Sequence, residues 1–339
     1  MCGVPPVYNE SVNSKSQGSS QKQPALHTPV LFLLALVLGA LLAGPVAATD
    51  APQNSNAASR KDLISAVKRL EKKLGFHRTK NFHKESAESA VAYRCYYTGK
   101  LELPDSYEKL QIQQGTKAGC TLDTQKYDVF FYPMDANASG KTPISATLAH
   151  ESVERFLVVL PHEDFHANKE LRKLPANLSE AAATLVGFLT AVEVANEKFG
   201  DESEVYKNLQ QEPEIFGRKA EIINRHYTRL SQLYTAARNG EITEGDALAQ
   251  KQRLFEDIRQ ACGAIQPDAK SFNKCLAANN NAGLAFDKTY TTYYPLMYQL
   301  YLAKGRELKP TLNAIQRALN AKTESAAVQN LQKEVTSDQ

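Results

Sequence analysis

The sequence has no excess of charge of either sign, because its 339 residues carry 40 Lys and Arg against 37 Asp and Glu. These charges are scattered, so the chain lacks the concentrated basic face of a nucleic-acid-binding protein. No Cys-x-x-Cys spacing occurs among its 5 cysteines, which argues against a zinc site built from cysteine. No internal repeat of fixed period is present either. What remains is an ordinary globular composition, with no nucleic acid expected as a partner.

The N-terminal region contains an uncharged apolar run. Residues 1–29 are polar, and residues 30–43 (VLFLLALVLGALLA) then carry no charge. Such a run suits a signal peptide but is short for a helix across about 30 Å of hydrocarbon. The small residues at positions 46–48 (VAA) favour cleavage before Thr49, whereas retention would leave residues 30–48 as a membrane anchor. Both interpretations predict an exported chain that is periplasmic, secreted or tethered to the membrane.

Four cysteines follow this leader: Cys95, Cys120, Cys262 and Cys275. Disulfides are typical of exported proteins, and four cysteines allow three pairings. Pairing of sequence neighbours, Cys95 with Cys120 and Cys262 with Cys275, costs least in loop closure. Four buried free thiols are the alternative.

A short region of mixed character precedes a long helical one. Apolar residues at three- and four-residue spacing predict a helix over residues 61–74 that ends at Gly75. Residues 91–97 and 127–132 are rich in β-branched and aromatic side chains and predict two strands. Pro133 is expected to end the second strand, before a turn-like segment.

Helical periodicity dominates from about residue 145 onward. The predicted helices cover residues 145–171, 179–200, 203–238, 242–263, 281–305 and 310–322. We therefore predict an α+β fold that is predominantly helical, in which a small N-terminal part with a few strands packs on a larger helical part. Residues 49–60 are expected to be a linker, residues 61–322 a single domain, and residues 323–339 a frayed, flexible tail.

The segment His162-Glu163-Asp164-Phe165-His166 is an H-E-x-x-H motif. Histidines four positions apart share one helix face, so both imidazoles can reach one ion. Glu163 can then take a proton from a metal-bound water, because Zn²⁺ lowers the pKa of that water and polarises a peptide carbonyl. Pro161 requires that the helix either kinks or begins there. A solvated face with two unrelated histidines is the alternative interpretation.

Catalytic zinc needs a third protein ligand and an open position for water. Glu180 is the leading candidate, since a turn between two helices would bring it back beside the two histidines. His150 is a weaker alternative because three helical turns separate it from His162. In a competing interpretation, Asn177 caps a helix and Glu180 completes a capping box, binding backbone amides in place of metal.

These segments resemble the predicted aminopeptidase family, a group of exported bacterial H-E-x-x-H zinc metallopeptidases. That family's pattern adds an Asn-Glu-small-Ala segment after the metal helix and an Asn-Asn-Ala-x-Leu segment nearer the C-terminus. The corresponding residues here are His162–His166, Asn177–Ala183, Asn280–Leu284, Thr289-Tyr290 and Pro295, and Tyr127–Val129 is similar to the strand before the metal helix. Order and spacing match over roughly residues 60 to 305.

The resemblance implies that His162, His166 and Glu180 are zinc ligands and that Glu163 is the general base. It also places Tyr290 where a group is needed to stabilise the oxyanion formed when water attacks the carbonyl. Other candidates for that role are Tyr293, Tyr294 and the pair His226-Tyr227, and core packing is the alternative role for all of them.

The sequence departs from the family pattern at two places. Leu178 and Ser179 separate Asn177 from Glu180, whereas the family places its Glu directly after Asn. Residues 144–148 (ISATL) are a reduced form of the family's Ala-Tyr-Ser-Thr-Leu-Gly-like stretch, so substrate contacts there are undefined.

We therefore expect an exported zinc metallopeptidase that hydrolyses peptide bonds, with aminopeptidase action as the narrower expectation. A non-catalytic exported helical protein that binds zinc or an envelope partner is the alternative. An aminopeptidase must recognise the free α-amino group of its peptide substrate, and carboxylates near the metal usually do so. The candidates for this are Asp164, Glu170, Glu193 and Glu197. The sequence does not indicate an oligomeric state.

Overall fold

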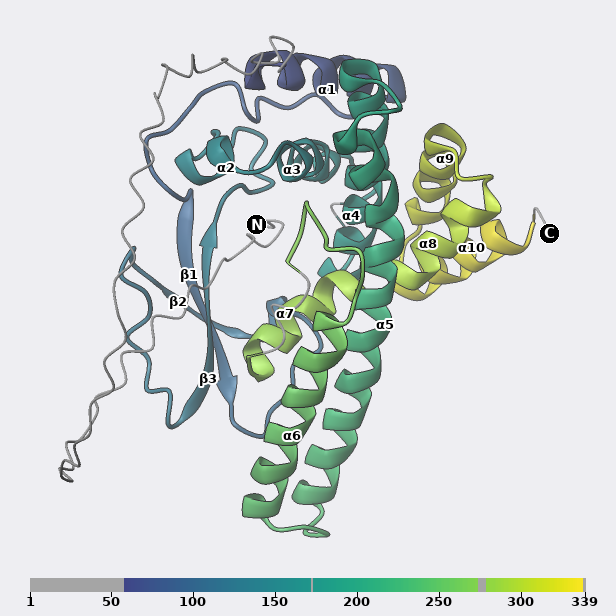
Figure 1. The fold of residues 1–339 in the computed structure, drawn as a ribbon. Coiled ribbons are helices and arrows are strands. Elements are labelled where there is room, and N and C mark those ends of the chain that lie inside the picture. The colour runs from purple at the N-terminus through teal and green to yellow at the C-terminus, as the bar shows by residue number, and fades with distance from the viewer. Residues whose placement is uncertain (1–57, 172, 274–278, 338–339) are drawn as a thin grey trace, which may run out of the picture. The chain divides into compact units, whose positions relative to one another are not determined.

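Figure 1 shows a computed structural model of the chain, which describes residues 58–171, 173–273 and 279–337. The expected leader, most of the expected linker and Cys275 lie outside these residues. The described part of the chain belongs to one compact unit.

A three-stranded antiparallel sheet forms the strand-containing part of the fold. Its strands are β1 (Ala92–Gly99), β2 (Gln111–Gln114) and β3 (Tyr127–Met134), in the order β2-β1-β3. Alternate β3 residues from Asp128 to Met134 are buried, so one face of this strand packs on the core. The predicted strands are confirmed, but Pro133 lies inside β3 and does not end it. Pro is tolerated there because β3 is an edge strand of this sheet.

Cys95 of β1 forms a disulfide with Cys120, which confirms one of the expected pairs and rules out four free thiols. The bond fits an oxidising compartment. The pairing of Cys262 with Cys275 stays a prediction.

The helix before the sheet, α1 (Arg60–Leu74), begins and ends close to its predicted limits. The Ser59 hydroxyl accepts a hydrogen bond from the Asp62 amide at its start. Gly75 follows with φ of 80°, a left-handed conformation that glycine adopts without the steric cost of a Cβ.

Most of the other described residues are helical, and the fold is predominantly helical α+β, as predicted. A single 3₁₀ turn, η1 (Tyr107–Lys109), lies between β1 and β2. The helices are α2 (Ala146–His150), α3 (Val153–Phe165), α4 (Ala176–Phe199), α5 (Glu204–Arg238), α6 (Glu244–Gly263), α7 (Asn281–Thr291), α8 (Tyr294–Ala303), α9 (Leu308–Leu319) and α10 (Glu324–Thr336).

Two predicted helices are each broken in the structure. The helix expected over 145–171 is divided at Ser152, whose hydroxyl accepts from the Arg155 amide and so starts α3. The helix expected over 281–305 is divided between α7 and α8, because Pro295 has no amide hydrogen to continue the helical hydrogen bonds. The expected flexible tail also differs, since most of it forms α10, which packs on α9.

Helix α4 is the central element of the core. It contacts α3, α5, α7 and α8, and α7 in turn lies between α4 and the sheet (Figure 1). Its length and hydropathy would suffice to cross a membrane, but 89% of its apolar window is buried inside the structure. It is therefore the core helix on which the other elements pack.

Candidate metal centre

Helices α3 and α4 pack closely against each other near His162. A Cβ placed on Gly187 of α4 would lie 3.0 Å from the Val158 carbonyl oxygen and 3.2 Å from the Cβ of His162. Glycine at this position therefore lets α4 pack directly against the turn of α3 that carries the first motif histidine.

The H-E-x-x-H motif forms the last turn of α3. The helix runs through Pro161 without a new start, and every residue from Glu154 to Phe165 is buried. His166 is the helix C-cap and keeps helical backbone angles, so both histidines stay on one face. The alternative of a solvated face is wrong, since His162 is fully buried and the side chain of His166 is 6% exposed.

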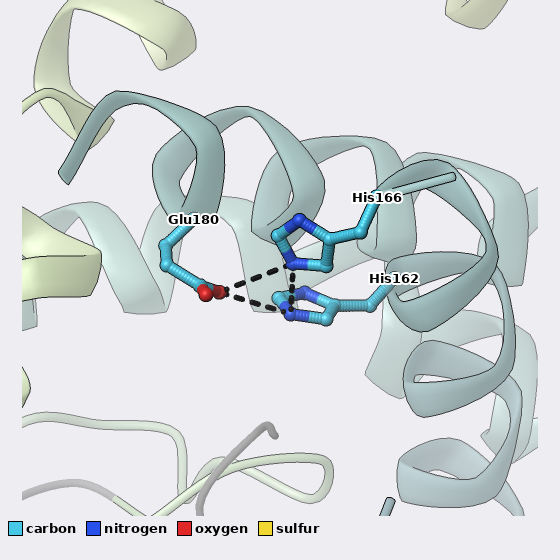
Figure 2. A group of neighbouring side chains, drawn as sticks. All are labelled: His162, His166 and Glu180. Carbon is cyan, nitrogen blue, oxygen red and sulfur yellow. Dashed lines mark hydrogen bonds and ion pairs between the residues drawn. The ribbon is translucent and has the colours of Figure 1, made fainter. Parts of the chain in front are cut away.

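Three side-chain atoms meet between α3 and α4 (Figure 2). Nε2 of His162 lies 3.3 Å from Nε2 of His166, and Oε2 of Glu180 lies 3.2 Å from the first and 3.3 Å from the second. Ligand atoms of a tetrahedral ion, about 2.0 Å from the metal, lie about 3.3 Å from one another. The spacing and chemistry of this donor set therefore fit a zinc ion.

Electrostatics and hydrogen bonding support a cation at this centre. Oε2 of Glu180 is buried and has no hydrogen-bond partner among the described residues. Burial alone would raise the pKa of Glu180, but His166 and His162 outweigh it and hold the pKa below its ordinary value. Burial lowers the pKa of His162, although Glu180 opposes this. The two shifts favour a carboxylate at Glu180 and a neutral imidazole at His162, which are the forms that bind metal.

The capping role considered for Glu180 is wrong. Helix α4 begins at Ala176 after Pro175, so Glu180 lies more than one turn inside it. The side-chain amide of Asn177 donates to the Asp105 carbonyl at 3.1 Å and to Oγ1 of Thr292 at 3.3 Å.

His150, the other candidate for a third ligand, does not join the centre. It is exposed at the end of α2, and its Nδ1 lies 2.7 Å from the Ala146 carbonyl oxygen. Of the two alternatives, the structure gathers only Glu180 with the motif histidines.

Tyr107 is a residue of the centre that sequence reasoning missed. Its hydroxyl donates a hydrogen bond of 2.9 Å to Oε1 of Glu180, while Oε2 faces the histidines. Its backbone amide donates to Oγ1 of Thr289 at 2.8 Å, which fastens η1 to α7. No spacing signals this contact, because 73 residues separate Tyr107 from Glu180.

Glu163 is buried next to the centre with both carboxylate oxygens lacking a hydrogen-bond partner among the described residues. Burial raises its pKa well above the ordinary value, and the negative charge of Glu180 raises it further. A buried carboxyl group without partners is costly for stability, which is typical of a group kept for function.

Tyr290 is the one oxyanion candidate that lies beside the centre within the described part of the chain. Its ring stacks on His162, with centroids 6.4 Å apart and an interplanar angle of 27°. The other candidates have structural partners. The Tyr293 hydroxyl bonds Glu324, the Tyr294 hydroxyl bonds the Pro213 carbonyl, the Tyr227 hydroxyl bonds the Leu103 carbonyl, and His226 bonds the Ile222 carbonyl.

The carboxylates proposed for recognition of an α-amino group are placed elsewhere. Asp164 is buried and accepts hydrogen bonds from Lys68, Thr79 and Asn81. Glu193 and Glu197 are exposed, roughly 20 Å or more along α4 from Glu180 at about 1.5 Å per residue. Glu170 lies in the connection after α3 and is half-buried. None of the four belongs to the group formed by the histidines and Glu180.

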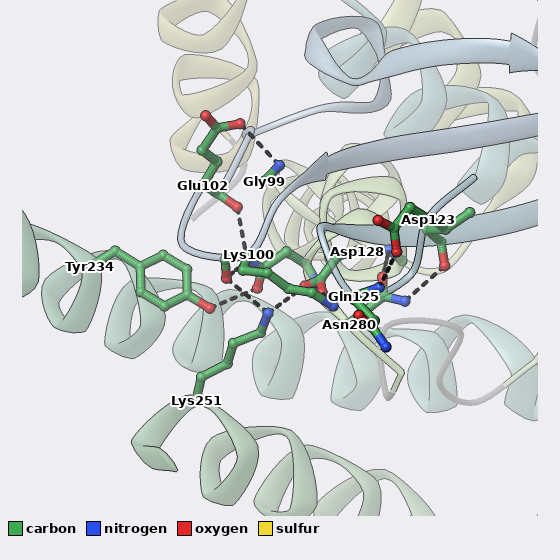
Figure 3. Close-up of polar contacts among 12 residues, drawn as sticks. Gly99, Lys100, Glu102, Asp123, Gln125, Asp128, Tyr234, Lys251 and Asn280 are labelled. Carbon is green, nitrogen blue, oxygen red and sulfur yellow. Dashed lines mark hydrogen bonds and ion pairs between the residues drawn. The ribbon is translucent and has the colours of Figure 1, made fainter. Parts of the chain in front are cut away.

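The segments at Tyr127–Val129 and Asn280–Leu284 meet at the start of α7 (Figure 3). The Asn280 side chain donates to the Val129 carbonyl at 2.8 Å, and the Asn281 amide donates to Asp128 at 3.0 Å. Asp128 also pairs with Lys100 and Lys251. These contacts fix the N-terminus of the helix that carries Thr289 and Tyr290, so both segments position the centre from a distance.

One comparison with known proteins gives a match. A family model described as "Putative aminopeptidase" matches residues 91–330, which include β1, η1, the motif helix, α4 and α7. The chain belongs to this family. The match confirms the aminopeptidase family expected from the sequence, and membership supports a peptidase with a peptide substrate. No curated protein and no solved structure matches the chain.

Proposed function

We propose that this member of the "Putative aminopeptidase" family is an exported zinc-dependent peptidase. His162, His166 and Glu180 would hold the ion, and Glu163 would be the general base. The observation that carries the proposal is the buried triangle of two Nε2 atoms and one Oε2 atom, which lie 3.2–3.3 Å from one another. Bound Zn²⁺ supplies a Lewis acid, which polarises a carbonyl and makes water more acidic.

Glu163 performs the proton transfers in this scheme. Its carboxylate accepts a proton from the attacking water, whose oxygen bonds to the carbonyl carbon, and then gives that proton to the nitrogen that leaves when the C–N bond breaks. Burial and the charge of Glu180 raise the pKa of Glu163, so its carboxylate takes up a proton more readily than an exposed glutamate does.

Tyr290 would stabilise the oxyanion through its hydroxyl. Its ring already lies against His162, on the helix that also carries Thr289 and through it holds Tyr107. Cleavage at the amino terminus rests on the family description alone, since the four carboxylates considered for the amino group lie outside the ligand group.

Export is supported by the Cys95–Cys120 disulfide and by the apolar segment at residues 30–43. The segment itself lies outside the described residues. Either a cleaved signal peptide or a retained anchor would place the peptidase outside the cytoplasm.

A zinc-binding protein without catalysis is the second candidate. The complete burial of His162, Glu163 and Glu180 favours it, because a closed metal site is typical of a structural role. The unpartnered carboxyl group of Glu163 favours the peptidase.

Cleavage of a peptide panel by the Glu163→Gln variant separates the two functions. The peptidase predicts that zinc content is kept and that the rate falls by roughly 10²–10⁴-fold. Glu193→Gln, an exposed carboxylate on α4, is the matched control and should cleave like the wild type. Equal rates for Glu163→Gln and wild type, with zinc bound to both, would instead favour the non-catalytic protein.

A further inference from the structure

A cavity of about 810 Å³ lies at the C-terminal end of α1, apart from the ligand atoms of the metal centre. One wall is the last turns of α1, and a second is the loop from Phe76 to His83. Gly140 and Ala167 complete it, and Ala167 follows His166 directly. Its size is that of a small-molecule site. We call this cavity the basic cleft because of the side chains that line it.

The backbone of the loop that forms the second wall is hydrogen-bonded to the rest of the fold at two points. The His77 amide donates to Oδ1 of Asn168 at 2.7 Å, and the Lys80 amide donates to the Gly140 carbonyl at 2.7 Å. The side chains of this loop therefore project from a backbone that is already fixed, and binding would not have to order it.

The acidic groups near the basic cleft do not neutralise its cations. Asp164 is paired with Lys68, so these two charges cancel. Glu71 is the one acidic residue of the lining, and it is 5% exposed. Its Oε2 lies 3.8 Å from Nζ of Lys68, so Glu71 faces Lys68 and not the other cations of the lining. Burial, with Asp164 adding to the effect, raises the pKa of Glu71.

Lys72, Arg78 and Lys80 then remain as cations of the lining, without an acidic partner among the described residues. Lys72 also lies in the last turn of α1, where a cation complements the helix dipole. That role does not account for Arg78 and Lys80, which lie beyond the helix. His77 and His83 are exposed on the same loop and add donors to the lining.

We propose that the basic cleft binds a small anion with phosphate or carboxylate groups, held by Lys72, Arg78 and Lys80. Arg78 offers the planar pair of donors that suits either group, and the two lysines supply point charges. This site is additional to the proposed peptidase function and does not depend on the metal.

Binding of inorganic phosphate and of succinate to the full chain tests the proposal by isothermal titration calorimetry. We expect the wild type to bind at least one of them, more weakly as NaCl is raised. The triple variant Lys72→Ala, Arg78→Ala, Lys80→Ala should bind it at least tenfold more weakly. Tighter binding of phosphate or of succinate would identify which of the two groups the cleft selects.

A second triple variant serves as the control. Arg225→Ala, Lys309→Ala and Lys322→Ala remove the same charge from exposed positions away from the cleft, and affinity should stay within twofold of wild type. Absence of binding of both anions to the wild type would overturn the proposal. An equal loss of anion affinity in the two triple variants would also overturn it. All variants are compared at the same zinc content and again without zinc. The result for anion binding is then independent of whether the zinc proposal holds.

Discussion

The hydroxyl of Tyr107 and the carboxylate of Glu180 are joined by a hydrogen bond of 2.9 Å. Since this bond engages Oε1, the other oxygen is turned toward the two histidines. A partner that orients a ligating carboxylate in this way usually matters for metal affinity as well as for packing.

We predict that Tyr107→Phe weakens zinc binding by roughly 10- to 100-fold while the fold is kept. Competition with a chromophoric chelator measures the zinc affinity, and circular dichroism reports on the fold. Tyr227→Phe is the control, because its hydroxyl bonds a carbonyl away from the centre, and it should bind zinc like the wild type. Unchanged affinity in Tyr107→Phe would show that Glu180 needs no such support.

Tyr290→Phe should lower kcat by about 10²-fold with KM and zinc content unchanged, because an oxyanion donor acts in the transition state. Tyr293→Phe removes a hydroxyl that bonds Glu324 and serves as the comparison. Steady-state kinetics of both variants on the same peptide decides whether Tyr290 stabilises the oxyanion or only packs in the core. If both variants retain wild-type kcat, Tyr290 has a packing role only.

The contact between α3 and α4 can be tested at Gly187. Gly187→Ala should destabilise the protein by about 1–3 kcal/mol, because the added methyl group would meet the Val158 carbonyl and His162 at close range. It should also weaken zinc binding. In Gly217→Ala the methyl group would meet Tyr298 at an ordinary 3.8 Å, so this control should be neutral or more stable. Urea unfolding measures the stability of the two variants. Equal stability of Gly187→Ala and Gly217→Ala would contradict the close packing of α3 on α4.

Glu212, a buried acid outside the metal centre, should make the stability of the protein depend on pH. Glu212 of α5 is fully buried and accepts hydrogen bonds from the Lys270 amide and the Ser271 hydroxyl. Burial raises its pKa to about 7. The pKa of Glu212 in the folded state is therefore above its value of about 4.5 in the unfolded state. Its stabilising contribution to the free energy of unfolding is complete below about pH 4.5 and is lost as the pH rises through 7.

The stability of wild type relative to Glu212→Gln should therefore fall by about 2 kcal/mol between pH 5 and pH 8. The variant carries no titratable group at this position, so the difference between the two proteins isolates Glu212. Urea unfolding at several pH values measures it. A pH-independent difference would mean that the pKa of Glu212 is not raised by the fold.

Much of the candidate site was predictable because its signals are local. Histidines at a spacing of four settle their shared helix face, and Gly75 ends α1 through its own backbone preference. The return of Glu180 to this face required only a short connection between two helices. Local chemistry of this kind can be read from a few neighbouring residues.

Features that depend on distant contacts were not predictable. Strand β2 (QIQQ) has no apolar pattern and forms through its pairing with β1. Tyr107 reaches Glu180 only because η1 is fastened to Thr289 of α7. Helix α10 is stabilised by burial of Ala327 and Leu331, which a sequence near the chain end does not reveal.

A crystal structure of the purified protein, with anomalous data collected at the zinc edge, tests the zinc site most directly. We expect one zinc, about 2.0–2.2 Å from Nε2 of His162, Nε2 of His166 and Oε2 of Glu180, and no anomalous peak there in Glu180→Ala. Absence of zinc from the wild type, or zinc held by other residues, would contradict the proposed zinc site.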